Sequence, residues 1–186
     1  MSLNAKDLES GKKKPVLVFV MGMHRSGTSL VTNIIHSAGY FISDEADLMP
    51  ATDYNKKGYF ERISVMEANE KILDIASGSW DNPPSHTDIT SIRIDPLIKK
   101  ILLPYYDTDK SVLKDPRFSL TFPVWEHLLD FDLKFIFVHR NSAGIAASLM
   151  KRDAFTESKC HQLIDDYVER TDLVLKDKNI FHLNYD

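Results

Sequence analysis

The sequence is poor in cysteine, in excess basic charge and in long apolar runs, and each scarcity excludes a class of protein. Its single cysteine, Cys160, can form neither an internal disulfide nor a cysteine-based metal site. The formal net charge of −4 gives no broad basic surface for nucleic acid. The apolar run at residues 16–23 is too short to cross a bilayer. These features predict a reduced, cytoplasmic protein with no membrane span and no nucleic-acid partner.

Metal-ligand spacing is also missing from the sequence, so we expect no metal site. The histidines are scattered along the chain rather than clustered: His24, His36, His86, His127, His139, His161 and His182. The length of 186 residues, 43% of them hydrophobic, suits one compact domain. We expect that domain at residues 15–186, after a flexible lead-in at residues 1–14. Nothing in the sequence specifies an oligomeric state.

Short apolar runs alternate with stretches of helical periodicity. The runs predict strands at Val16–Met21, 112–113, 134–138 and 180–183. The periodic stretches predict helices at 28–38, 64–75, 142–150 and 159–175. This alternation is typical of a three-layer α/β/α fold with a central parallel sheet, similar to P-loop nucleotide-binding proteins. The irregular segments 41–57 and 77–91 are long enough to predict functional loops beside the strand ends.

The first strand runs directly into a turn with the features of a phosphate-binding loop. Gly22 and Gly27 allow backbone conformations that other residues resist, and a helix with hydroxyl side chains follows. Backbone N–H groups at a helix N-terminus favour phosphate or sulfate. The glycine spacing matches the nucleotide-triphosphatase loop, but Thr28 stands where that motif has its lysine, and the nearest cation is Arg25. An ordinary helix start capped by Ser and Thr is the alternative.

A second strand–turn–helix segment carries another candidate anion site. Arg140 follows the strand at 134–138, and Ser148 lies eight residues later. An arginine at a strand end can clamp an anion with two hydrogen bonds. Alternatively, Ser148 is only a small residue that allows the helix to pack closely on the sheet.

These two segments resemble the nucleotide-binding motifs of sulfotransferases. His24-Arg-Ser-Gly-Thr-Ser-Leu is similar to the 5′-phosphosulfate loop of the bacterial and tyrosylprotein branches, and residues 135–149 are similar to the 3′-phosphate motif. The donor of that family is 3′-phosphoadenosine 5′-phosphosulfate (PAPS). The resemblance implies a contact from Arg25 to the sulfonate, and it implies a set of nucleotide ligands: Arg25, Ser26, Gly27, Thr28 and Ser29 for the 5′-phosphate, with Arg140 and Ser148 for the 3′-phosphate.

Two further segments resemble sulfotransferases and suggest catalytic groups. Lys114 begins a Lys-Asp-Pro sequence at a strand end, and the resemblance implies that it stabilises the leaving phosphate and the migrating sulfonate. Asp115 and Arg117 are either ligands or a structural pair that holds the turn. Glu61 ends Asn55-Lys-Lys-Gly-Tyr-Phe-Glu and is the predicted base, because a carboxylate is ionised at neutral pH.

Asp44 and Glu45 are the alternative bases. The resemblance thus implies sulfuryl transfer from PAPS, without a metal, to a hydroxyl or amine on a small-molecule, carbohydrate or peptide acceptor. A P-loop kinase for small molecules and a non-catalytic nucleotide-binding module are the alternatives. Sulfotransferases usually continue beyond the fourth strand, so we expect the domain to lack the usual C-terminal segment.

Overall fold

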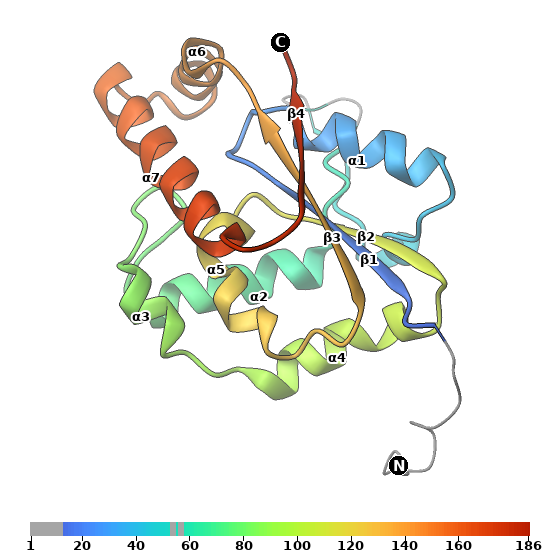
Figure 1. Cartoon of the computed structure of the whole chain (residues 1–186). Helices are drawn as coiled ribbons and strands as arrows, with labels where there is room; N and C mark the ends of the chain where they lie inside the picture. The colour runs from blue at the N-terminus through green and yellow to red at the C-terminus, as the bar shows by residue number, and fades with distance from the viewer. Residues whose placement is uncertain (1–12, 53–54, 56–57) are drawn as a thin grey trace.

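Four parallel strands form the centre of the fold in the computed structural model, which describes residues 13–52, 55 and 58–186 (Figure 1). Their order across the sheet is β2-β1-β3-β4, with β1 and β3 in the middle. Their bounds are Val16–Met21 for β1, Lys110–Lys114 for β2, Asp132–His139 for β3 and Ile180–Asn184 for β4. Parallel pairing carries the carboxyl ends of all four strands to one edge of the sheet.

The central strand β1 is buried on both faces. Leu17, Phe19 and Met21 point into the larger core, whereas Val18 and Val20 point into a smaller one. Alternation of side chains along a strand explains this division. An apolar run without polar residues is therefore what a strand covered on both faces requires.

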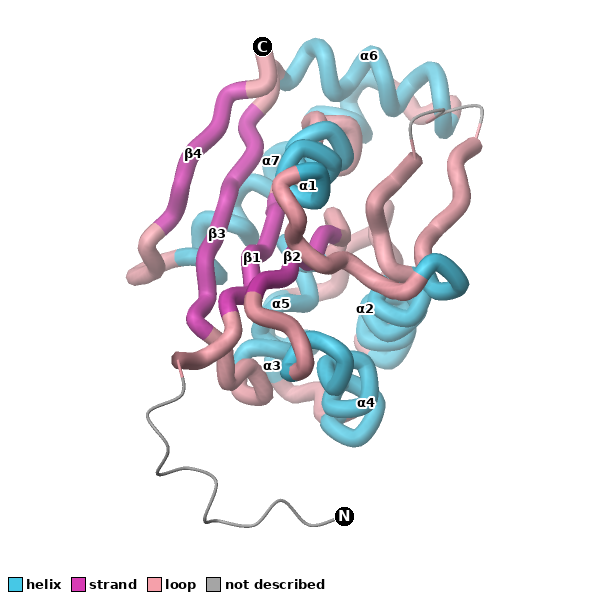
Figure 2. The backbone as a smooth tube through the Cα atoms, turned by 90° about the vertical axis from the view of Figure 1, so that its right-hand side faces the viewer, coloured by secondary structure: helices cyan, strands magenta, loops and turns pink. Residues whose placement is uncertain are grey.

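Helices cover both faces of the sheet, which confirms the predicted three-layer α/β/α fold (Figure 2). Helix α1 (Thr28–Ser37) packs on the smaller core. The helices on the other face contribute to the larger core: α2 (Ile63–Ile75), α3 (His86–Thr90), α4 (Asp95–Tyr106), α5 (Phe118–Glu126), α6 (Ser142–Asp153) and α7 (Glu157–Leu175). No helix of the described residues is both long and apolar enough to span a membrane.

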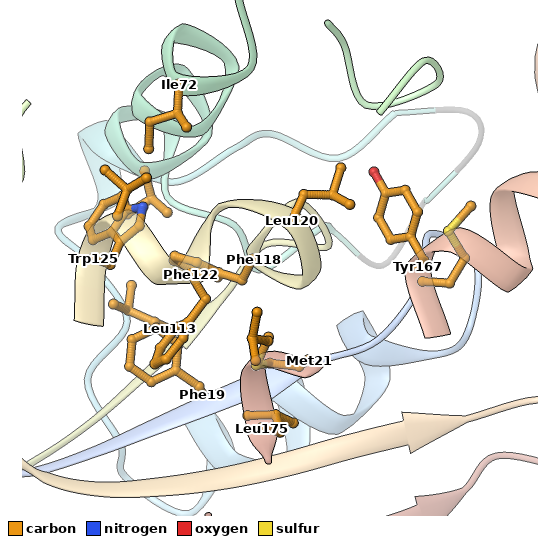
Figure 3. Packing of buried hydrophobic residues seen from close by; sticks show 14 of the residues in the cluster. Phe19, Met21, Ile72, Leu113, Phe118, Leu120, Phe122, Trp125, Tyr167 and Leu175 are labelled. Carbon is orange, nitrogen blue, oxygen red and sulfur yellow. The ribbon is translucent and has the colours of Figure 1, made fainter. Parts of the chain in front are cut away.

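Aromatic rings fill the larger core (Figure 3). The ring of Phe19 lies 5.1 Å from the rings of Phe118 and Phe122, in edge-on contacts with each. Trp125 is fully buried, and its indole N–H donates to Asn69 Oδ1 at 2.9 Å. These contacts fix α2 and α5 against the sheet, and so they fix the loops that precede both helices.

The predicted elements are present, but three helices were missed. Helix α5 carries apolar residues all round and contains Pro123, so it lacks the amphipathic period that indicates a helix. Helix α4 has that period in Ile98, Ile101, Leu102 and Tyr105, so its signal was present in the sequence. Helix α3 lies in the segment predicted as loop. The irregular segment 41–52 contains a short 3-10 turn, Glu45–Asp47, and isolated β-bridges at Phe41, Leu48 and Thr52. Residues 1–12 of the expected lead-in, and residues 53–54 and 56–57 of the loop, lie outside the described residues.

Candidate functional site

A cleft of about 400 Å³ opens at the carboxyl ends of β1, β2 and β3. The turn after β1, the last residue of β2 and the first residue after β3 all contribute to its wall. This is the edge at which open parallel sheets bind ligands. Its volume is in the usual range for small-molecule sites.

The turn after β1 has a backbone suited to an anion. Gly27 has a φ of 97° and Arg25 a φ of 69°, both in the left-handed region. Ser26 Oγ donates to Met23 O at 2.7 Å inside the turn, and no side chain in the described part of the chain caps the N-terminus of α1. The alternative of an ordinary helix start capped by Ser and Thr is therefore wrong. The first N–H groups of α1 have no side-chain acceptor among the residues that the structure describes, and they lie at the cleft, where they can bind phosphate.

The two predicted anion motifs meet in this cleft, although they are more than a hundred residues apart in the sequence. Arg140 Nη1 donates to the backbone carbonyl of Arg25 at 2.7 Å. Arg25 Nε in turn donates to Ser148 Oγ at 2.8 Å. The sequence-predicted nucleotide ligands therefore form one continuous cluster. The guanidinium of Arg25 lies at Ser148, the residue predicted to serve the 3′-phosphate.

Lys114 and Glu61 form a buried ion pair in the wall of the cleft. Lys114 Nζ donates to Glu61 Oε1, and the side chains are only 2% and 7% exposed. The same ammonium group donates to Ser29 Oγ at 3.1 Å, which joins the pair to the phosphate loop. Burial raises the pKa of Glu61, and the attraction of Lys114 offsets this rise only in part.

The structure separates the candidate bases. Glu61 lines the cleft, whereas Asp44 and Glu45 lie exposed at the 3-10 turn and do not line it. Of the predicted bases, Glu61 therefore has the position from which a carboxylate could act.

Asp115 and Arg117 form the structural pair that holds the turn after β2. The backbone N–H and the guanidinium of Arg117 both donate to the buried Asp115 carboxylate, and Arg117 Nη2 donates to Glu70 at 2.8 Å. Burial opposes the charge of Arg117, but Asp115, Glu61 and Glu70 together raise its pKa above the usual range. The guanidinium also borders the cleft.

Several residues at the cleft were not among the predicted site residues, and three of them bear on its chemistry. Arg152 follows Ser148 by one helical turn on α6, a spacing that could have indicated it. Tyr185 packs its ring on Gly27 so closely that a Cβ there would lie 2.1 Å from ring carbon Cδ2. His24 is buried, and burial, together with nearby cations led by Arg117, holds its pKa well below 6.5.

Comparisons with known proteins add little to this geometry. No family model matches the sequence. No curated protein matches it either. Among solved structures, the crystal structure of TT1252 from Thermus thermophilus is similar at 15% sequence identity and a TM-score of 0.47, over 91% of this chain and 89% of that chain. A likeness at this level says nothing about function.

Proposed function

We propose that this protein is a sulfotransferase that binds PAPS and transfers its sulfuryl group to an acceptor hydroxyl or amine. The proposal depends on one observation, the chain of hydrogen bonds that joins the two motifs. Arg140 Nη1 donates to the backbone carbonyl of Arg25 at 2.7 Å, and Arg25 Nε donates to Ser148 Oγ at 2.8 Å. A nucleotide phosphorylated at both the 3′ and 5′ positions needs two anion sites separated by a single sugar. The joined cluster and its resemblance to the two sulfotransferase motifs support such a ligand.

The proposed transfer uses groups already in contact. The acceptor oxygen or nitrogen would form a bond to sulfur while the bond from sulfur to the bridging oxygen of the 5′-phosphate breaks. Lys114, 3.1 Å from Ser29 Oγ, would stabilise the charge that grows on that oxygen. Glu61 would take the acceptor proton once Lys114 turns toward the leaving phosphate. Its raised pKa makes it a better base than an ordinary glutamate. The products would be the sulfated acceptor and adenosine 3′,5′-bisphosphate.

The acceptor is proposed only as a small molecule, a carbohydrate or a peptide. A cytoplasmic location is also part of the proposal, and the free, buried thiol of Cys160 is consistent with a reducing compartment. A non-catalytic nucleotide-binding module would use the same ligand cluster without transfer.

A P-loop kinase is the second candidate, because one observation favours it. The phosphate loop lacks its own lysine, yet Lys114 reaches Ser29 Oγ from β2. A lysine delivered from the neighbouring strand could contact the terminal phosphates of ATP. The 3′-phosphate decides between the candidates, because ATP has none.

Isothermal titration calorimetry of adenosine 3′,5′-bisphosphate against ATP with magnesium tests the proposal. We expect clear preference for the bisphosphate, and loss of that preference in Arg140→Gln. Lys151→Gln, which removes an exposed positive charge from α6, is the matched control and should bind like the wild type. Preference for ATP in the wild-type protein would overturn the proposal in favour of the kinase.

Transfer itself is tested with PAPS and a panel of phenol, carbohydrate and tyrosyl-peptide acceptors. We expect product with the wild-type protein. Glu61→Gln should lose transfer while it keeps its affinity for adenosine 3′,5′-bisphosphate. Bisphosphate binding without transfer to any acceptor would favour the non-catalytic module.

A further inference from the structure

Helix α6 carries one stripe of residues beside the arginines of the cleft. Gly144, Ser148 and Arg152 follow one another at intervals of four residues, which places them on one helix face. A Cβ on Gly144 would lie 3.2 Å from Arg140 Nε, so the missing side chain leaves room for that guanidinium. Ser148 accepts from Arg25, and Arg152 lines the cleft one turn further on. Arg25 contacts Ser148, Arg140 lies beside Gly144 one turn before it, and Arg152 follows one turn after it, so the stripe brings three arginines close together.

Carboxylates neutralise this concentration of positive charge only in part. Among the described residues, no carboxylate lies within 4 Å of Arg25. Among the same residues, the carboxylate nearest to Arg140 Nε is that of Asp186 at 3.9 Å, and they offer this buried Nε no hydrogen-bond partner. Arg152 is paired, by its Nε, with Asp153. Burial and the charge of Arg152 lower the pKa of Arg25, as expected for a cation that lacks its anion.

We infer that Arg25 is a ligand of the 3′-phosphate, with Arg140 and Ser148, and that it determines the preference for nucleotides that carry this group. The inference rests on the proposed function. The family resemblance implies the 5′ end for Arg25, but Arg25 Nε lies 2.8 Å from Ser148 Oγ, the residue that the resemblance gives to the 3′-phosphate. The 5′-phosphate would then be bound by the N–H groups at the start of α1 and by the ammonium group of Lys114.

The test compares ligands that differ only at the 3′ position. Wild-type protein, Arg25→Gln and Lys151→Gln are titrated with adenosine 3′,5′-bisphosphate and with adenosine 5′-monophosphate by calorimetry. A charge-assisted hydrogen bond lost to a phosphate corresponds to about a tenfold to hundredfold change in Kd. We therefore expect Arg25→Gln to raise the Kd for the bisphosphate by that factor and to change the Kd for the monophosphate by no more than about twofold. Lys151→Gln should change neither.

The outcomes separate this inference from the function on which it rests. If wild-type protein prefers the bisphosphate but Arg25→Gln weakens both ligands equally, Arg25 serves the 5′ end and the inference fails while the function stands. Unchanged affinities in Arg25→Gln also refute the inference. If the wild-type protein shows no preference for the bisphosphate, both fail. Should Arg25→Gln not fold, Arg25→Lys keeps the charge but loses the Nε–H donor to Ser148, and the same selective loss is expected of it.

Discussion

The buried pair of Lys114 and Glu61 predicts a specific response to mutation. Lys114→Met removes the only group that forms an ion pair with Glu61 among the described residues, and the Glu61 side chain is only 7% exposed in the wild-type structure. Removing one partner of a buried pair costs about 3–5 kcal/mol, because the remaining charge stays desolvated. In a protein of this size, 1 kcal/mol moves Tm by about 2–4 °C. The expected fall in Tm is therefore about 6–20 °C.

The same pair predicts how this loss depends on pH. Lys114 lowers the pKa of Glu61 against the effect of burial, so its removal raises that pKa further above 4.5. Between 4.5 and the raised value, the native state of Lys114→Met holds a proton that the unfolded chain has released. The free energy of unfolding then falls as pH rises through this window. The deficit of Lys114→Met relative to the wild type should be smallest near pH 4.5 and should grow toward neutral pH.

Urea denaturation of four proteins measures both effects: the wild type, Lys114→Met, Glu61→Leu and the double variant. Because an apolar pair of similar volume can replace a buried ion pair at little cost, the double variant should recover most of the loss. A double variant that loses as much stability as the two single variants together, or a Lys114→Met deficit that does not change with pH, would refute the role given to this ion pair.

Three other perturbations test separate parts of the structure. Gly27→Ala should lower the free energy of unfolding, measured by urea denaturation, by about 1–3 kcal/mol, because the φ of 97° disfavours a side chain and the added Cβ would clash with Tyr185. Adding Tyr185→Ala should restore part of this stability. An unchanged free energy of unfolding in Gly27→Ala would contradict the close contact. The free energy of unfolding of the wild type should fall as the pH drops from about 7 to 5, and His24→Asn should make this fall smaller. The unfolded chain binds a proton near 6.5 while the folded His24, with its lowered pKa, does not, so stability is lost as pH falls; an unchanged profile would exclude His24 as the source. Asn69→Ala should lower the free energy of unfolding, measured by chemical denaturation, by about 2–4 kcal/mol, because it leaves Trp125 Nε1 buried without its acceptor. A loss of less than about 1 kcal/mol would contradict this role of the Asn69 amide.

Local patterns in the sequence were enough to predict the layers of the fold and the two anion motifs. The strand Val16–Met21 is an unbroken apolar run, and glycines follow it at the turn, so neighbouring residues carry the whole signal. Arg140 and Ser148 lie at the end of one strand and in the next helix, and their spacing alone fixes their relative places. Helix α5 escaped prediction because burial on every side removes the period that a sequence can show.

Only the tertiary structure decided which partner each site residue contacts. The sequence carries no sign that Lys114 pairs with Glu61, 53 residues away, or that Arg25 reaches Ser148, 123 residues away. Those contacts depend on the order β2-β1-β3, which brings the ends of three strands to one edge. Side-chain spacing along the chain is fixed by the backbone of each element, whereas contacts between elements are fixed by how the sheet and its helices pack.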